Sequence, residues 1–479
     1  MKNLSNRLLC FSIAGAVMLS VISCATTKKL PTEEPAAPTA QQPEPSVPKK
    51  TEEFSKTGFV ERLNETLKTK TPEDALLLYD TLPVEYADDF DLLFLKAAIL
   101  VSAAKYDEAD ILCKALLVRQ PDNTDVMALA AVIAKAKGDT AGRKTQLAAI
   151  IAKDPNNSEA NIALADDEVL KRNYNTARSY YSKALKDEPS NEEALVGFGE
   201  TCYFLEDDDK AEETFNTVLE NNPECDAAYY YLGKLAYADS SYKKAASNIE
   251  KAIALNGKNF DYYLDYGMYL RFLGRLADAE KAWTEAIELQ PDYFLGYVYR
   301  GGLYDEEEKL DQALADYRKV VSLNPSYYFA YESLGLLALH SQSWTEAREA
   351  FMKCREVNKT NISYPLMITY CYYKEGDKIN AKKYSDSVLR TMDNTSVEYL
   401  VLRAFHDETG KLPLDQRISE VDSQNKKGKL YFYVGLLYDM FGGTEIAKQY
   451  YTKVVSMNCP MFFEYRLAEW GVKITDGSN

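Results

Sequence analysis

Helix-stopping residues recur along this chain at one fixed spacing. Counting in steps of 34 residues meets seven of them, at Pro121, Pro155, Pro189, Pro223, Gly257, Pro291 and Pro325. Proline ends a helix because it lacks the amide hydrogen of the helix ladder, and glycine is favoured just past a helix end. Seven equally spaced stops without an insertion predict a chain built from copies of one structural unit.

Other positions keep the same phase. Twelve residues before each stop the residue is alanine, as at Ala279, except that Arg143 occupies this place in one copy. Twenty-four residues before the stop it is always alanine or glycine, and eight before it is mostly bulky, as at Trp283. Tiny residues suit places where two helices approach closely, because a larger side chain would overpack. Each copy is therefore expected to hold two helices and a short turn, with a local distortion in the copy that contains Arg143.

A 34-residue helix-turn-helix unit with this pattern resembles the tetratricopeptide repeat. The resemblance implies an all-α, right-handed superhelical solenoid of about ten to eleven repeats. Repeats are expected to start at Phe90, Thr124, Ser158, Glu192, Asp226, Phe260, Phe294, Tyr328 and Ile362. The array is assigned to residues 51–393, with a worn first copy from about Lys56. A degenerate repeat follows over 394–427, where Pro413 lies at the expected start of a second helix, and then a last repeat and a capping helix over 428–479.

The N-terminal sequence resembles an export signal. A short apolar run after Lys2 and Arg7 ends in Val21-Ile22-Ser23-Cys24, which resembles the lipobox of bacterial lipoprotein signal peptides. The resemblance makes residues 1–23 the signal peptide and Cys24 the lipidated residue; an ordinary secretory signal with an incidental cysteine is the alternative. Residues 24–50 are rich in proline and poor in aliphatic bulk, as in a disordered tether. Because Ala25, not aspartate, follows the cysteine, the expected location is the periplasm-facing outer membrane of the bacterial envelope.

Charge and chemistry exclude several function classes. The net charge is −17, and removing residues 1–23, which hold two lysine or arginine residues and no acid, makes it −19. Nucleic-acid binding is disfavoured, because phosphate contacts need clustered cations. The two histidines, His340 and His406, lie on different repeats, and no glycine-rich phosphate loop follows a strand. We expect no enzyme activity, no cofactor and no metal. The cysteines are widely spread without a CxxC motif, which suits small buried side chains.

The remaining candidate for function is a surface. In the tetratricopeptide family the first helix of each repeat lines the concave face with positions 2, 5, 6, 9, 12 and 13. Those positions define a candidate partner-binding groove of Tyr203, Tyr230, Tyr231, Lys234, Tyr237, Arg271, Phe272, Tyr299, Tyr370 and Tyr373. Tyrosine suits recognition because it offers a large rigid area and one polar tip. The alternative is that part of this stripe is packing, since the chain holds 36 tyrosines.

Two functions from different classes fit this surface. The first is an envelope scaffold or adaptor that binds protein or peptide partners in its groove and is held to the membrane by its lipid. The second is a small-ligand binding protein that captures an apolar solute for a transporter. Because Lys234 and Arg271 stand out in an acidic body, the partner is expected to present apolar side chains and at least one acidic group.

Overall fold

The computed structural model describes residues 54–409 and 413–475, and within those ranges the chain is entirely helical apart from its turns. The predicted signal peptide, Cys24 and the tether lie outside the described residues. The described chain divides between Pro223 and Glu224 into two compact parts, which are taken separately. The all-α repeat fold expected from the sequence is confirmed.

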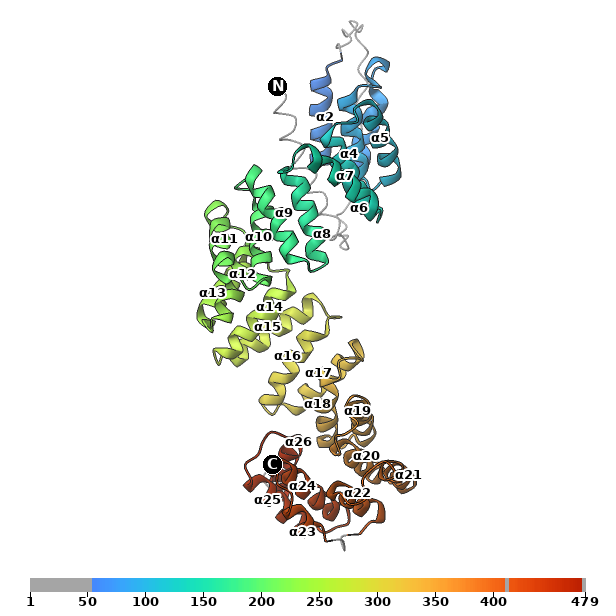
Figure 1. Ribbon diagram of the computed structural model, residues 1–479, viewed down its shortest axis with the longest axis vertical. Coiled ribbons are helices and arrows are strands. Elements are labelled where there is room, and N and C mark those ends of the chain that lie inside the picture. Colours follow the sequence, from blue (N-terminus) through green and yellow to red (C-terminus); the bar gives the residue numbers. More distant parts are fainter. Residues whose placement is uncertain (1–53, 410–412, 476–479) are drawn as a thin grey trace, which may run out of the picture. The chain divides into compact units, whose positions relative to one another are not determined.

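The N-terminal part begins with an irregular repeat and continues with regular helix pairs (Figure 1). Its elements are α2 (Lys56–Thr69), α3 (Pro72–Leu77), the 3-10 helices η2 (Leu78–Thr81) and η3 (Val84–Tyr86), α4 (Phe90–Ser102), α5 (Tyr106–Arg119), α6 (Thr124–Ala136), α7 (Thr140–Lys153), α8 (Ser158–Leu170), α9 (Tyr174–Asp187), α10 (Glu192–Phe204) and α11 (Asp208–Asn221). The first helix pair departs from the repeat pattern because its second helix, α3, has only six residues.

The C-terminal part continues the same pairing and ends in a single helix. Its elements are α12 (Asp226–Ala238), α13 (Tyr242–Leu255), α14 (Phe260–Phe272), α15 (Leu276–Leu289), α16 (Phe294–Glu306), α17 (Leu310–Leu323), α18 (Phe329–His340), α19 (Trp344–Val357), α20 (Ser363–Lys374), α21 (Lys378–Leu389), α22 (Val397–Asp407), α23 (Leu414–Ser419), α24 (Gln424–Met440), α25 (Thr444–Ser456) and α26 (Phe463–Thr475). None of the helices in the described ranges is both long and apolar enough to cross a membrane.

The helix starts follow the 34-residue phase. Seven first helices begin at the expected residue, from Phe90 in α4 to Phe294 in α16, and α18 and α20 begin one residue late. Every first helix of these nine repeats is followed by a residue in the left-handed conformation, at Ala104, Gly138, Arg172, Glu206, Ser240, Gly274, Glu308, Gln342 and Gly376. The left-handed residue turns the chain so that the next amides bond back to the last carbonyls of the helix, as Arg275 N does to Leu270 O at 2.9 Å.

Helix contact inside a repeat explains the small and bulky positions. Trp283 of α15 is 2% exposed and donates from its indole Nε1 to the Leu264 carbonyl of α14 at 3.1 Å. A Cβ at Gly267 would lie 2.4 Å from that nitrogen, so only glycine leaves room for the ring. Gly335 faces Phe351 in the same way, with 2.9 Å to the ring. Ala279 is fully buried at the contact of α15 with α14.

The expectation of a distorted repeat around Arg143 is wrong. Helices α6 and α7 span 13 and 14 residues, as their counterparts in the neighbouring repeats do. The arginine is buried, but its long side chain reaches α8, where Nε pairs with the Asp167 carboxylate at 3.0 Å and Nη2 donates to the Ala163 carbonyl at 3.0 Å. A charge-paired head lets the arginine replace alanine without bending the helices.

Candidate functional site

Three predicted groove residues of α12 contact one another or α14. Tyr230 and Tyr237 are half-buried. The Tyr230 ring lies 4.8 Å from Tyr262, and the Lys234 Nζ atom lies 5.1 Å from the centre of the Tyr230 ring. Tyr237 stacks on Tyr269 with 5.0 Å between ring centres. The α12 stripe is therefore both a surface and a contact between neighbouring repeats, and burial raises the pKa of the Tyr230 hydroxyl.

Phe272 is the most accessible aromatic residue of the predicted groove. Its ring is 53% exposed, stacks on Tyr242 at 4.8 Å with an angle of 18°, and meets the edge of Tyr237 at 5.5 Å. Contact with two aromatic rings fixes the phenylalanine while half of it faces solvent. An ordered, exposed aromatic ring is what a binding surface needs, because little side-chain entropy is then lost on association.

The two predicted cations of the groove are already paired. Lys234 Nζ lies 3.3 Å from the Asp265 carboxylate of α14. Arg271 donates from Nε and Nη2 to one carboxylate oxygen of Glu306 on α16, at 3.0 and 2.6 Å. Each pair links a first helix to the first helix of the next repeat. The premise of an uncompensated positive charge, from which an acidic partner was expected, is therefore wrong, because each of these cations has a carboxylate partner within the chain.

Three further groove residues, Tyr203, Tyr231 and Tyr299, are also half-buried. Tyr231 and Tyr299 are half-buried; Tyr231 meets the edge of Tyr230 at 5.3 Å, and Tyr299 stacks on Trp283 at 5.7 Å. Burial raises the pKa of the Tyr299 hydroxyl. Tyr203 belongs to the N-terminal part, where it is half-buried and meets the edge of Phe204 at 5.4 Å. We use the name α12–α16 surface for the following set: Tyr230, Tyr231, Lys234, Tyr237, Asp261, Asp265, Arg271, Phe272, Tyr299, Asp305 and Glu306.

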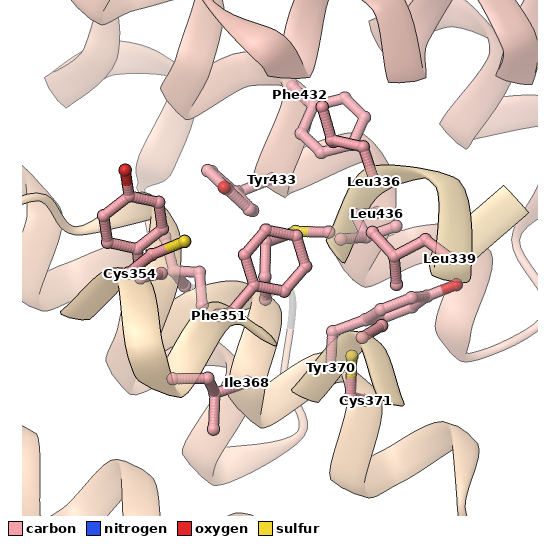
Figure 2. Packing of buried hydrophobic residues seen from close by; sticks show 14 of the residues in the cluster. Leu336, Leu339, Phe351, Cys354, Ile368, Tyr370, Cys371, Phe432, Tyr433 and Leu436 are labelled. Atoms are coloured by element: carbon pink, nitrogen blue, oxygen red, sulfur yellow. The ribbon is translucent and has the colours of Figure 1, made fainter. Parts of the chain in front are cut away.

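Tyr370 and Tyr373 lie in the core, which corrects their assignment to the groove. They are 7% and 9% exposed. Figure 2 shows Tyr370 packed among buried residues that include Leu339 and Cys371. Tyr373 donates to the Phe405 carbonyl of α22 at 2.9 Å. The packing alternative left open for the tyrosine stripe therefore applies to α20, where helices that follow in the chain cover this side.

The C-terminal helix α26 does more than cap the array. It packs on α24 and α25, and it also returns to much earlier repeats. Arg466 Nη1 pairs with the Asp305 carboxylate of α16 at 2.8 Å, across 161 residues of sequence. Trp470 lies edge-on to His340 at the end of α18, with 4.7 Å between ring centres, and Lys473 pairs with Glu308 at 3.3 Å. The sequence predicts a capping helix here but contains no sign of these distant contacts.

An open cleft of about 480 Å³ separates α26 from the ends of α14 and α16. Its lining consists of Arg271, Gly302, Asp305, Glu306, Glu308, Pro460, Tyr465, Arg466, Glu469, Trp470 and Lys473. Three ion pairs cross or border it: Arg271 with Glu306, Arg466 with Asp305, and Lys473 with Glu308. The cleft therefore adjoins the α12–α16 surface and is lined mostly by charged residues, with Trp470 and Tyr465 as its aromatic residues.

A buried carboxyl group helps to hold α26. Glu464 is fully buried and accepts a hydrogen bond from the Tyr433 hydroxyl of α24 at 2.8 Å. The Tyr433 hydroxyl also lies 3.2 Å from the Ser363 carbonyl of α20. Burial raises the pKa of Glu464, although Lys429 and the hydrogen bonds oppose the shift. The folded protein therefore favours the neutral carboxyl more than the unfolded chain does.

We expect Glu464→Gln to change the pH dependence of stability. Because the folded pKa is raised, the native state binds more protons than the unfolded state above the ordinary pKa, so stability falls as pH rises. Glutamine keeps an oxygen for Tyr433 and cannot ionise. The urea midpoint of the variant relative to the parent should increase as the pH rises from about 4.5, the ordinary pKa of glutamate, through the raised pKa of folded Glu464, whereas exposed Glu445→Gln should show no such trend. A constant difference for Glu464→Gln would contradict a raised pKa.

Within residues 54–409 and 413–475, no group of three or more His, Cys, Asp and Glu side chains is placed to hold a metal ion. His340 is exposed against Trp470, and the Nδ1 atom of His406 lies 3.0 Å from the Ser385 hydroxyl oxygen. Five of the six described cysteines are buried and all six are free thiols, in agreement with their predicted role as small buried side chains. Burial raises the pKa of Cys113 and of Cys354 to about 12.

Comparison with known proteins supports the repeat assignment. One family model of the tetratricopeptide repeat matches residues 169–235, and a second matches residues 264–327 and 300–353. Residues 169–235 and 264–353 are therefore similar to tetratricopeptide repeats. The matched segments contain α9 to α11, most of α12 and α14, and α15 to α18, whereas α13 lies between them. They include every residue of the α12–α16 surface except Tyr237 and Asp261.

The similar proteins share this repeat with the chain over limited lengths. Protein O-mannosyl-transferase TMTC3 from Homo sapiens is 23% identical over 164 residues, which are 31% of this chain and 18% of the relative. Mitochondrial import receptor subunit TOM70 from Homo sapiens is 23% identical over 146 residues, which are 30% and 24%. The solved structure of pilF from Pseudomonas aeruginosa is 20% identical with a TM-score of 0.34, and the match covers 44% of this chain and 96% of that one. The chain thus spans less than a third of these curated relatives.

Proposed function

We propose that this protein is a lipid-anchored scaffold that binds a protein or peptide partner on the α12–α16 surface. Proteins built from tetratricopeptide repeats generally serve as protein-interaction scaffolds. The observation that carries the proposal is Phe272, a half-exposed ring held between Tyr237 and Tyr242. Aromatic residues of this kind supply most of the binding energy in many interfaces, because they bury a large area when the partner covers them.

The proposed anchor is Cys24 at the end of the lipobox-like sequence. Two or more acyl chains on this residue would hold the protein stably, whereas one chain binds a bilayer only marginally. Residues 25–50 would then act as a proline-rich spacer, which at about 3 Å per residue reaches several tens of ångströms. The proposed location is the outer membrane of a bacterial envelope, with the repeats in the periplasm.

Capture of an apolar solute is less well supported. An apolar ligand needs a pocket lined mainly by hydrophobic side chains. The cleft beside α26 is open and lined by seven charged residues, namely Arg271, Asp305, Glu306, Glu308, Arg466, Glu469 and Lys473. Burying an apolar solute against these side chains would cost part of their hydration without a compensating contact. The described cleft therefore suits polar groups of a macromolecular partner.

The test is capture of partners by crosslinking in intact cells, followed by detergent extraction and pull-down. We expect the double variant Tyr237→Ala and Phe272→Ala to retain about a tenth or less of the partner, because loss of interface aromatics commonly costs about 2 kcal/mol. Circular dichroism should show unchanged helical content. Phe441→Ala is the matched control, since Phe441 is 45% exposed and lies outside the α12–α16 surface. Normal capture by a folded double variant would place the partner elsewhere.

A further inference from the structure

The charge of the α12–α16 surface is the opposite of what its cations suggest. Lys234 and Arg271 are each neutralised by an acid of the next repeat, Asp265 and Glu306. Arg466 in turn neutralises Asp305 from α26. Each cation on or beside this surface thus has a carboxylate within hydrogen-bond or ion-pair distance, so the surface offers a partner no uncompensated positive charge.

Two carboxylates on or next to this surface are not neutralised by a cation in this way. Within the described ranges, Asp261 of α14 and Glu469 of α26 take part in no ion pair. Asp261 is exposed near the start of α14, so its carboxylate is accessible to a partner. Glu469 lines the cleft next to Trp470. The local surplus is therefore negative: Asp261 lies near the start of α14, and Glu469 lines the cleft next to the other end of that helix, where the exposed Phe272 lies.

Helix α26 shows what kind of segment already rests against these repeats. One side of it carries Arg466, Trp470 and Lys473, spaced four and three residues apart, so the three side chains share one face. Each contacts an earlier repeat: the arginine at Asp305, the tryptophan at His340 and the lysine at Glu308. A helix with a basic and aromatic face therefore already packs against the repeats that adjoin the α12–α16 surface.

We propose that the α12–α16 surface and the adjoining cleft bind a basic amphipathic helix of a partner protein. This inference rests on the proposed function and specifies the partner's chemistry. The apolar side chains of the helix cover Phe272 and Tyr237, and its lysine or arginine side chains reach Asp261 on one side and Glu469 in the cleft on the other. The chemistry follows from continuity with α26, which meets Asp305 and Glu308 through cations of its own.

The probes are two synthetic helical peptides with the same leucine and tryptophan face, one flanked by lysine and arginine and the other by glutamate. Fluorescence anisotropy with the full chain should show at least about tenfold tighter binding of the basic peptide. Added salt should weaken it by slowing association. Equal or tighter binding of the glutamate peptide would overturn the inference.

A charge-matched pair of variants separates a specific site from general attraction to an acidic protein. Asp261→Asn with Glu469→Gln should weaken the basic peptide about fivefold or more. Glu285→Gln with Glu288→Gln removes the same charge from exposed positions of α15 and should leave the affinity nearly unchanged. An equal loss in both pairs would overturn the inference.

Failure of this inference is distinguishable from failure of the proposed function. If the glutamate peptide binds tightly and Phe272→Ala abolishes its binding, the surface is a docking site for a partner of the other charge. The basic-helix proposal then falls and the scaffold proposal stands. If neither peptide binds, the basic-helix proposal also falls, and the crosslinking experiment with Tyr237 and Phe272 variants decides the scaffold role by itself.

Discussion

Cys24→Ser should leave the protein without lipid and release it from membranes into the soluble fraction. In the proposed lipoprotein, acylation needs the sulfur of the cysteine that ends the lipobox-like sequence, and a serine hydroxyl does not replace it. Because Cys24 is the cysteine in this sequence context, no second residue is expected to take over. The effect should be all or none, since two acyl chains and no acyl chain differ by many buried methylene groups at about 0.8 kcal/mol each.

Metabolic labelling with a fatty acid and partition between detergent and water phases measure this outcome. Cys459→Ser is a suitable control, because Cys459 is half-buried in the folded repeats and is not part of a lipobox-like sequence. A Cys24→Ser protein that still carries label and enters the detergent phase would contradict the lipoprotein interpretation. An ordinary secretory signal would instead yield a parent protein that lacks label from the start.

Ala279→Leu should destabilise the array by about 1–3 kcal/mol through overpacking. Ala279 is fully buried in α15 and packs with Trp283 and residues of α14, so three added carbons have no free volume. Thermal unfolding followed by circular dichroism should show a clearly lower midpoint. Lys281→Leu is the control on the same helix: the Lys281 side chain is 79% exposed, and its replacement should change stability by no more than about 0.5 kcal/mol.

Equal and small effects of the two leucine substitutions would mean that the helix contact has been assigned to the wrong face of α15. The same unfolding measurement also tests the coupling between neighbouring repeats. Neighbouring repeats stabilise one another, so a local loss at Ala279 should broaden or split the transition as well as lower its midpoint.

The local features of this fold were predictable because each is set by residues close in sequence. The pattern within each repeat predicts where its two helices begin, end and make contact. It consists of a helix stop every 34 residues, a tiny residue as at Gly267 or Ala279, and a bulky residue as at Trp283. Seven of the nine first helices from α4 to α20 therefore start at the predicted residue, and the other two start one residue later. The left-handed residue after each first helix was less visible, because residues such as Arg172 and Glu308 occupy it in place of glycine. The surrounding helix pair compensates for the strain.

The candidate site was only partly predictable, because accessibility depends on what else covers a repeat. Tyr237 and Tyr373 hold the same position in their repeats, yet the first is half-buried and the second is core, where it bonds to Phe405 of α22. No pattern within one repeat contains that difference. The pair Arg271–Glu306, 35 residues apart, is one repeat plus one residue and could have been inferred from the period.

The sequence by itself determined the repeat, its phase and the helix contacts within it, since a periodic chain needs only short-range information to form each pair of helices. The tertiary structure decided which inner positions stay open. Helix α26 returns across 161 residues to pair with Asp305, and α22 and α24 bury the tyrosines of α20. Such contacts depend on how many repeats lie between the partners and on how each rotates the next, which no single repeat encodes.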